Sequence, residues 1–319
     1  VNLDWLEEKT PSKRDRIREL QGRLSPGLLN LNAVLPGRVL DESAAGRRWI
    51  DEWGTGWYND GHGAKTEHYP LEPGYHLLAD HPFPDPDAPG RFDKADELLR
   101  HRNGRYALGR VWFTLFERLW MLRGFETMLV DPYLETDGFC KLRDRITAFN
   151  CRMIDHWLER GVDGVFFSDD WGSQRGLLMD PDDWRRFYLP CYRVLFNRVR
   201  QGGAHVWMHL CGNIIPILPD LIHIGLNVLN PVQPQAMDTS ELSQRFGGKV
   251  CFYGGVDVQG TMIQGTPDDV RREVKDLVAR FGRFGGGYIG GTSHSIMPET
   301  PLDNVIALYE TFLELHEHA

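Results

Sequence analysis

Short apolar runs alternate with longer stretches of helical periodicity from Tyr106 to the end of this chain. The pattern predicts six strands, at 106–113, 164–170, 206–211, 227–230, 250–254 and 287–294. It predicts helices between and after them, at 115–129, 139–160, 182–200, 214–223, 240–246, 267–281 and 301–316. Strands that alternate with helices form a parallel sheet, because each crossover helix returns the chain to the same edge.

The first hundred residues are less regular. Helices are expected from Lys13 to Leu24 and from Asp93 to Arg102, with a proline-rich connector at 80–90 and segments rich in aromatics, Gly and Pro elsewhere. We expect an irregular N-terminal extension (1–100) packed on the main part of a single (β/α)8 barrel domain (101–319). Two further strands must then come from the irregular regions. The closed barrel is preferred to an open doubly wound sheet, because the chain contains no GxGxxG or GxxxxGK[ST] phosphate loop.

Several helix starts are marked by capping residues. Asp180, Thr266 and Thr300 each precede a proline, which is favoured at the first helical position. Thr114 and Glu117 have the spacing of a capping box.

Composition limits the class of protein. A net charge of −9 over 319 residues argues against a nucleic-acid groove as the main surface. Five cysteines without a CxxC pair indicate a reducing compartment rather than a disulfide framework. We find no secretory signal and no apolar run long enough for a membrane span, so we expect a cytoplasmic protein. A homodimer would be ordinary.

The apolar run that begins at Val206 carries the strongest candidate chemistry. Side chains alternate along a strand, so His209 and Cys211 project from one face, about 7 Å apart along the backbone. Zinc takes such ligands, and a site that keeps an open position does chemistry. The alternative is a core histidine beside an inert buried cysteine. His294 ends a later strand at the same rim, whereas Cys251 begins its strand and should lie at the opposite end.

Other polar residues also gather at the predicted strand ends, where a barrel places its active site. Asp169, Asp170 and Asp257 are candidates for acid–base work or metal binding, although one of the paired aspartates could cap a turn instead. Trp171, like Trp53 and Trp57, could form an aromatic wall for a ring-shaped substrate or simply pack. The remaining candidates for substrate binding are Gln174, Asn230, Gln233 and Gln259.

Four segments of the chain resemble the uroporphyrinogen decarboxylase superfamily. They are GVDGVFFSDDWG at 161–172, HLCG at 209–212, GGVD at 254–257 and SHSIMPETPLDNV at 293–305. The resemblance runs from about Asp51 to the C-terminus, and the last segment is its most specific part. It implies a distorted (β/α)8 barrel with the site at the strand carboxyl ends.

This superfamily contains true decarboxylases and zinc methyltransferases that work with corrinoid proteins. The arginine-rich RQAGRY motif of the decarboxylases is missing here, whereas His209-Leu-Cys211 resembles the first part of the methyltransferases' zinc motif. The late cysteine of that motif falls on His294. If a metal is bound, we expect from the strand ends that His209, Cys211 and His294 hold it, with a carboxylate such as Asp169 or a substrate atom completing the sphere; the zinc of the methyltransferases is what the resemblance implies.

The sequence therefore favours a methyltransferase-like enzyme that moves a methyl group from a small methylated substrate towards a corrinoid protein. In that reading the metal activates the leaving group, and the corrinoid arrives on a partner, because the chain shows no corrinoid-binding domain. The runner-up is a cofactor-free decarboxylase or lyase acting on a carboxylated small molecule, with His209 and Cys211 only lining the pocket. A non-catalytic ligand-binding barrel is the third reading.

Overall fold

The computed structural model describes residues 11–24, 27–35, 46–61 and 63–317. It divides into two compact units, which we treat separately. The N-terminal unit comprises Leu29–Asp170 and Met179–Val206, and the C-terminal unit comprises Val1–Leu28, Trp171–Leu178 and Trp207–Ala319. Both units draw on residues from either side of position 100.

A seven-stranded sheet has the order β1-β5-β6-β7-β8-β9-β10. Its strands are β1 (Leu28–Leu31), β5 (Tyr106–Val111), β6 (Gly164–Ser168), β7 (His205–His209), β8 (Val228–Val232), β9 (Cys251–Val256) and β10 (Tyr288–Thr292). The pairs β5–β6, β7–β8, β8–β9 and β9–β10 are parallel. The α/β architecture and the six predicted strands are confirmed, and β1 adds a seventh. The described residues contain no eighth strand in this sheet, so a closed eight-stranded barrel is not established.

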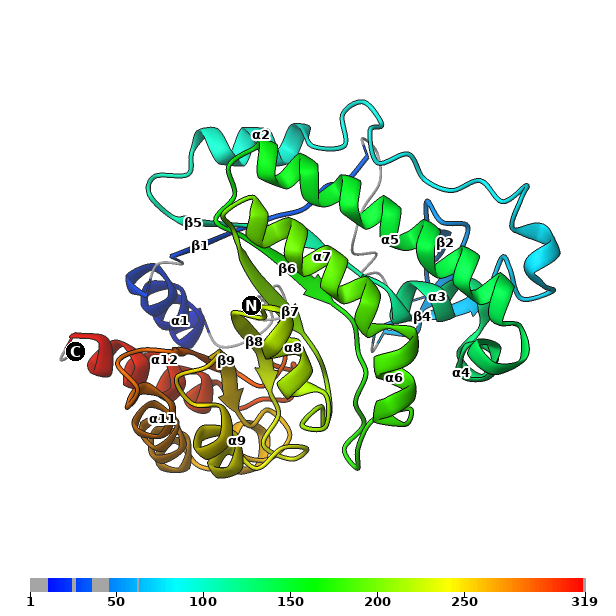
Figure 1. Cartoon of the computed structure of the whole chain (residues 1–319). Helices are drawn as coiled ribbons and strands as arrows, with labels where there is room; N and C mark the ends of the chain where they lie inside the picture. Colours follow the sequence, from blue (N-terminus) through cyan, green and yellow to red (C-terminus); the bar gives the residue numbers. More distant parts are fainter. Residues whose placement is uncertain (1–10, 25–26, 36–45, 62, 318–319) are drawn as a thin grey trace. The chain divides into compact units, whose positions relative to one another are not determined.

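Close packing of a helix on β5 organises the N-terminal unit. Trp157 of α5 (Thr136–Glu159) is fully buried and donates its indole N–H to the Arg110 carbonyl. The ring lies directly over Gly109, where an added Cβ would meet it at 2.5 Å. Helix α5 also packs against α7 (Leu189–Gln201), as Figure 1 shows.

Two predicted helices are each broken in two. The stretch 115–129 forms α3 (Phe116–Arg123) and α4 (Phe125–Leu134), because Gly124 turns the chain with φ +92°. The stretch 182–200 forms α6 (Pro181–Phe187) and α7. Asp180 and Thr266 cap α6 and α11 (Pro267–Gly282) as predicted, but the Thr300 hydroxyl has no hydrogen-bond partner among the described residues and α12 starts at Leu302.

The N-terminal region holds more regular structure than its sequence indicates. Three strands form an antiparallel sheet of order β2-β3-β4. A single turn of 3-10 helix follows this sheet in the sequence. These elements are β2 (Arg48–Ile50), β3 (Gly56–Asn59), β4 (Ala64–His68) and η2 (Tyr75–Leu77), and α2 (Asp93–Arg100) follows them. The strands are only three to five residues long, too short for an alternation pattern to mark them.

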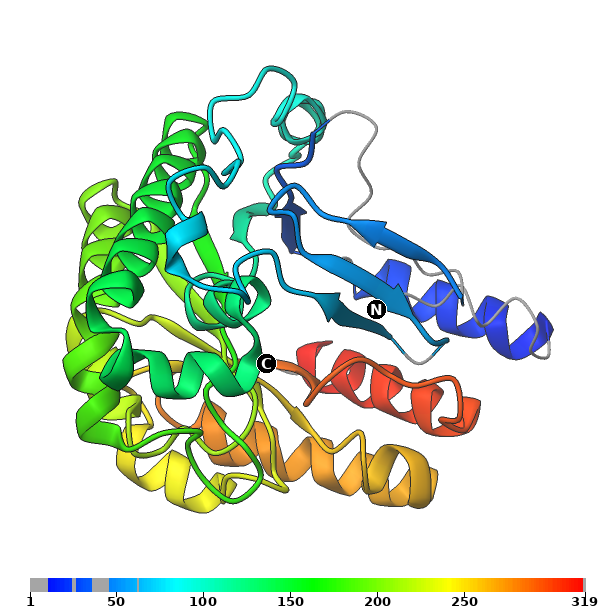
Figure 2. The same cartoon turned by 90° about the vertical axis from the view of Figure 1, so that its right-hand side faces the viewer.

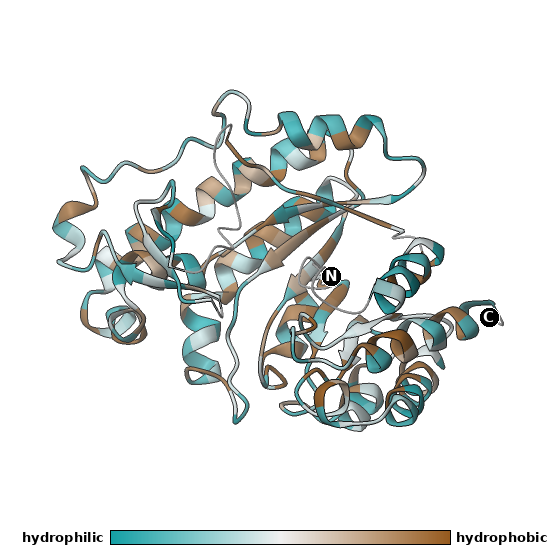
Figure 3. Ribbon diagram, turned by 180° about the vertical axis from the view of Figure 1, so that it is seen from behind, coloured by the Kyte–Doolittle hydropathy of each residue, from teal (hydrophilic) through white to brown (hydrophobic). Residues whose placement is uncertain are grey.

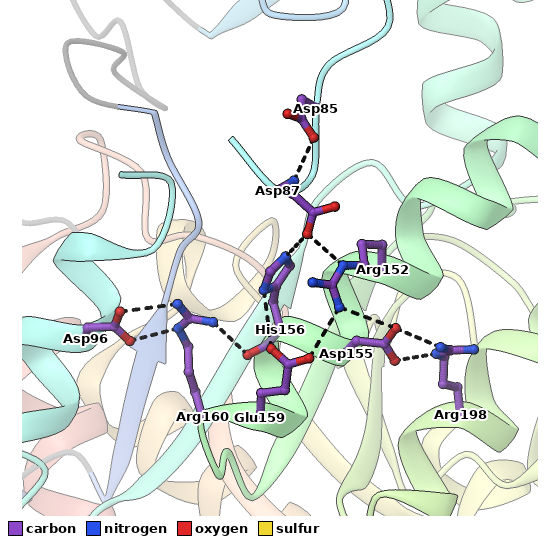
Figure 4. A network of polar contacts seen from close by, with 9 residues as sticks. All are labelled: Asp85, Asp87, Asp96, Arg152, Asp155, His156, Glu159, Arg160 and Arg198. Atoms are coloured by element: carbon purple, nitrogen blue, oxygen red, sulfur yellow. Dashed lines mark hydrogen bonds and ion pairs between the residues drawn. The ribbon is translucent and has the colours of Figure 1, made fainter. Parts of the chain in front are cut away.

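Ion pairs anchor the proline-rich connector to α5 (Figure 4). Asp87 of the connector accepts hydrogen bonds from Arg152 and His156, and Arg160 pairs with Asp96 of α2. Arg198 of α7 joins the same network through Asp155. Each exposed pair contributes little by itself, about 0–1 kcal/mol, but together they fix a segment that has few hydrogen bonds of its own.

In the C-terminal unit, the first and the last described helices pack against each other. Helix α1 (Pro11–Arg23) lies beside α12 (Leu302–Glu317), as Figures 1 and 2 both show. Arg16 donates to Glu310 and Gln21 to Tyr309, while Ile17 and Leu20 are completely buried. The other helices are α8 (Leu218–Ile224), α9 (Thr239–Phe246), α10 (Thr261–Gln264) and α11.

Hydropathy follows this packing. Figure 3 shows brown, apolar strands at the centre of the seven-stranded sheet and helices that carry both brown and teal residues. None of the described helices is long and apolar enough to cross a membrane.

Candidate functional site

His209, Cys211 and His294 converge within the C-terminal unit. One possible ligand atom from each lies within 4.8 Å of the others. The Cys211 sulfur is 3.3 Å from His209 Nε2. Ligands of a tetrahedral zinc lie about 3.5 Å apart, so the Cys211–His209 pair has the spacing that zinc requires, and a thiol with two imidazoles is a donor set that zinc takes. The structure thus brings together the three residues predicted to hold a metal, and Cys251 is not in the cluster.

Asn230 fixes the orientation of the His209 ring. The Asn230 side-chain oxygen lies 2.8 Å from His209 Nδ1, and its amide nitrogen donates to the Tyr253 carbonyl at 3.4 Å. Nδ1 must therefore carry the proton, which leaves the lone pair of Nε2 facing Cys211. Hydrogen bonds of this kind set the tautomer and raise the basicity of metal-binding histidines. Asn230 was predicted to bind substrate, and the structure shows this positioning contact.

The turn after Cys211 is held by close backbone contacts. Gly212 has φ +78°, and a Cβ there would meet the Gly172 backbone at 2.2 Å. The Gly172 N–H donates to the Cys211 carbonyl, and the Gly212 N–H donates to the side chain of Gln233. Gln233, also predicted to bind substrate, therefore supports the loop that carries the candidate thiolate.

Asp257 lies at the end of β9 and is almost completely buried. Its carboxylate accepts hydrogen bonds from Gln235 at 2.6 Å and from the Gln259 backbone at 2.9 Å. Gln174 donates to the Gln259 side chain at 3.4 Å. These contacts define the surroundings of Asp257, Gln174 and Gln259, whose roles towards a substrate remain predictions.

Asp169, in the N-terminal unit, caps a helix. Its buried carboxylate accepts the backbone N–H groups of residues 115, 116 and 117 at 2.7–3.0 Å, together with the Tyr192 hydroxyl. The predicted capping box is wrong, because Thr114 bonds Val111 and Ser168 instead of the α3 backbone. An acceptor distant in sequence replaces it. Burial raises the pKa of Asp169 to about 7 against the opposing effect of these donors.

Glu117 is a buried acid to which the sequence pattern assigned only a capping role. Its side chain accepts a hydrogen bond from Ser168 at 3.1 Å. Burial and then the charges of Asp170 and Asp169 raise its pKa well above the ordinary value. Asp169 has four donors and Glu117 has one, so Glu117 is the member that stays protonated. The adjacent charges of Glu117 and Arg118 inside an apolar helical run were the available signal.

The predicted aromatic residues lie in different units. Trp171 is fully buried in the C-terminal unit. Trp53 and Trp57 belong to the N-terminal unit, where Trp57 stacks on Phe113 with ring centroids 5.8 Å apart. A shared wall for one substrate therefore remains a prediction.

A sequence profile of the family "Uroporphyrinogen decarboxylase (URO-D)" matches residues 113–315. This chain belongs to the URO-D family. The matched segment contains the candidate metal ligands His209, Cys211 and His294 and every predicted catalytic aspartate.

Curated relatives include both decarboxylases and a methyltransferase. The chain is 27% identical to uroporphyrinogen decarboxylase of Nostoc punctiforme over 58% of its own length and 49% of the relative's. It is also 27% identical to "Methylcobamide:CoM methyltransferase MtaA" of Methanosarcina barkeri, over 54% of this chain and 48% of that one. The URO-D chain thus spans about half the length of the curated relatives it matches.

Solved structures support the fold. A methyltransferase from Methanosarcina mazei superposes with a TM-score of 0.65 at 20% identity, covering 94% of this chain and 82% of that one. A B12-independent methionine synthase from Shewanella sp. W3-18-1 gives 0.51 at 12% identity, covering 98% and 89%. At these identities the likeness establishes the architecture of the URO-D chain and leaves its activity open.

Proposed function

We propose that this URO-D family protein is a methyltransferase that moves a methyl group from a small methylated substrate towards a corrinoid protein. The observation that carries the proposal is the convergence of His209, Cys211 and His294, with Asn230 fixing the His209 tautomer. The Methanosarcina barkeri relative, a methyltransferase named for methylcobamide and CoM, supports this branch of the family and a corrinoid as the reaction partner.

The metal we propose is zinc, bound by His209 Nε2, the Cys211 thiolate and His294. Bound there, zinc supplies a Lewis acid for the substrate oxygen or sulfur that loses the methyl group. Asn230 selects the tautomer of neutral His209 that points the Nε2 lone pair at Cys211, and Gln233 with Gly172 holds the Cys211 turn in place. His294 is exposed, so the cluster faces solvent on one side and remains accessible to a ligand.

We assign different roles to the three predicted catalytic aspartates. Asp257 and Asp170 are proposed to orient the substrate or to carry protons. Asp169 accepts three backbone N–H groups at the start of α3 and the Tyr192 hydroxyl, twice as many hydrogen bonds as Asp257 accepts, so we assign it a positioning role. Gln174 and Gln259 complete the proposed substrate contacts, whereas the fully buried Trp171 is assigned the packing role that was its alternative. The corrinoid acceptor, the cytoplasmic location and a homodimer belong to the same proposal.

A decarboxylase or lyase is the second candidate. Several curated relatives, including the one from Nostoc punctiforme, carry that name. In this version the aspartates stabilise a protonated substrate, while His209 and Cys211 line the pocket without metal.

Metal content separates the two candidates. We expect about one zinc per chain in protein purified without chelator, loss of that zinc in Cys211→Ala, and loss of methyl transfer to a corrinoid acceptor with it. Cys251→Ala is the matched control, because burial raises the pKa of the Cys251 thiol to about 11 and Cys251 is outside the cluster. Full zinc content or full methyl transfer in Cys211→Ala would reject the zinc mechanism. Elemental analysis and a transfer assay supply the two readouts.

A further inference from the structure

The N-terminal unit contains a cavity of about 760 Å³ that the candidate site does not use. Its walls come from the segment after β1, the β2–β3 sheet, the end of β5 and one face of α5. Most of these residues precede position 113, where the family match begins. The volume falls in the usual range for small-molecule sites, about 300–1,000 Å³.

Flat aromatic surfaces form much of the wall. Trp49 stacks on Trp57 with centroids 6.0 Å apart and planes 6° apart, and Trp57 stacks on Phe113. Trp53 and Trp112 also line the cavity. Such surfaces favour a planar ring, which gains dispersion contacts at little entropic cost.

The backbone at Phe113 is strained where it meets the cavity. Phe113 has φ +52°, a region that bulky residues rarely adopt. This conformation accompanies the contact of its ring with Trp57 and places the ring 5.4 Å from the Arg118 guanidinium carbon. Strain of this kind concentrates at ligand sites, where the surrounding structure maintains it.

The described charges that line the cavity are mainly positive. The described residues that line the cavity include two acids, Asp51 and Glu52, and four arginines (47, 91, 110 and 118). Positively charged side chains therefore outnumber negatively charged ones by two. The chain as a whole carries −9. An aromatic cage without this excess would suit a cationic ammonium ligand, whereas here the charge favours an anion.

Arg118 has hydrogen-bonding capacity left for a ligand. Its guanidinium is almost completely buried and lies over Trp53, yet it donates only one hydrogen bond to described residues, to Asp51 at 2.9 Å. Its Nε has no partner among them. Arg91, by contrast, makes two hydrogen bonds to the Glu52 carboxylate and two to the Asp85 carbonyl. A buried guanidinium with unused donors is suited to bind a carboxylate.

We propose that this cavity binds a planar aromatic carboxylate, with the ring against the tryptophans and Phe113 and the carboxylate on Arg118. The inference does not depend on the metal or on methyl transfer, because every contact that carries it lies within the N-terminal unit.

The test uses 2-naphthoate as the probe, with 2-naphthamide and 2-naphthylmethylammonium as the neutral and cationic analogues. Isothermal titration calorimetry should show saturable binding of 2-naphthoate, and at least tenfold weaker binding of both analogues. Arg118→Met should weaken 2-naphthoate binding about tenfold or more. Arg160→Met is the matched control, since Arg160 also pairs with an aspartate and stacks on an aromatic ring but lies outside the cavity.

Two further measurements keep the outcome decisive. Arg47→Met changes an exposed cavity arginine and should weaken binding even if Arg118→Met fails to fold. Cys211→Ala should bind 2-naphthoate with unchanged affinity, which distinguishes failure of this proposal from failure of the proposed zinc site. Equal affinity for the acid and the amide, no saturable binding of 2-naphthoate, or unchanged affinity in folded Arg118→Met would overturn the proposal.

Discussion

Single residues in this protein act mainly through partners far away in sequence. Asp169 caps a helix that begins more than fifty positions earlier, and Asn230 sets the tautomer of His209 on the neighbouring strand. In both cases the sequence pattern identified a polar residue at the end of a predicted strand. The partner, and hence the role, depended on which strand ends meet.

Glu117 provides a residue-scale prediction for pH dependence. Its pKa in the folded protein lies well above the unfolded value, so the folded state retains a proton that the unfolded state releases. The associated stability is complete below about pH 4.5 and is lost as the pH rises through the raised pKa. Glu117→Gln removes this titration. We expect the variant and the wild type to melt together at pH 4, and the variant to melt a few degrees higher at pH 8.

Thermal melts from pH 4 to pH 8 check this expectation. Glu126→Gln, at an exposed position of α4, is the control and should follow the wild type throughout. If the melting temperatures of the wild type and of Glu117→Gln instead change with pH by the same amount, Glu117 is ionised in the folded protein.

At the scale of elements, glycine decides how closely helices and strands approach. Gly109 lets α5 lie against β5, with the Trp157 indole over the strand. Gly124 and Gly212 turn the chain where the sequence pattern continued a helix or ended a strand. The close approach at Gly109 and the positive φ of Gly124 are therefore two features that hydrophobic periodicity did not mark.

Two glycine-to-alanine substitutions should change stability in opposite directions. Gly109→Ala places a methyl group 2.5 Å from the Trp157 ring and should lower the free energy of unfolding by about 1–3 kcal/mol. Gly22→Ala in α1 meets nothing within 4 Å and should raise it by about 0.5–1 kcal/mol, because alanine is the better helix former. Urea denaturation measures both. If Gly109→Ala raised the free energy of unfolding as much as Gly22→Ala does, the Trp157 ring would have moved to accept the methyl group without loss of stability.

At the scale of the whole molecule, the first described helix, α1, packs against the last one, α12. Leu20 of α1 is completely buried, and α1 exchanges hydrogen bonds and ion pairs with α12. The C-terminal unit is therefore assembled from both ends of the sequence.

Leu20→Ala should consequently destabilise the C-terminal unit. We expect a loss of about 2–4 kcal/mol from the cavity it creates. Hydrogen exchange should show faster exchange in α12 as well as in α1. Glu19→Ala, on the exposed face of the same helix, should stay within about 0.5 kcal/mol of the wild type. A large effect confined to α1 would show that the two helices unfold independently.

The sequence by itself determined the alternation of strands and helices after Tyr106, the family resemblance and the set of strand-end candidates. Hydrophobic periodicity is a local property, so it survives in a single sequence. The same reasoning missed β1 to β4, whose short segments show no period, and it gave Glu117 a capping role that the structure assigns to Asp169.

Only the tertiary structure decided which candidates meet. It brought His294 to His209 and Cys211, and it placed Asn230 against His209 and Gln233 against the turn after Cys211. Within the N-terminal unit it gathered four tryptophans and Arg118 around a cavity. Such meetings depend on strand order, register and close packing. These are set by contacts between residues far apart in the chain, and no local pattern records them.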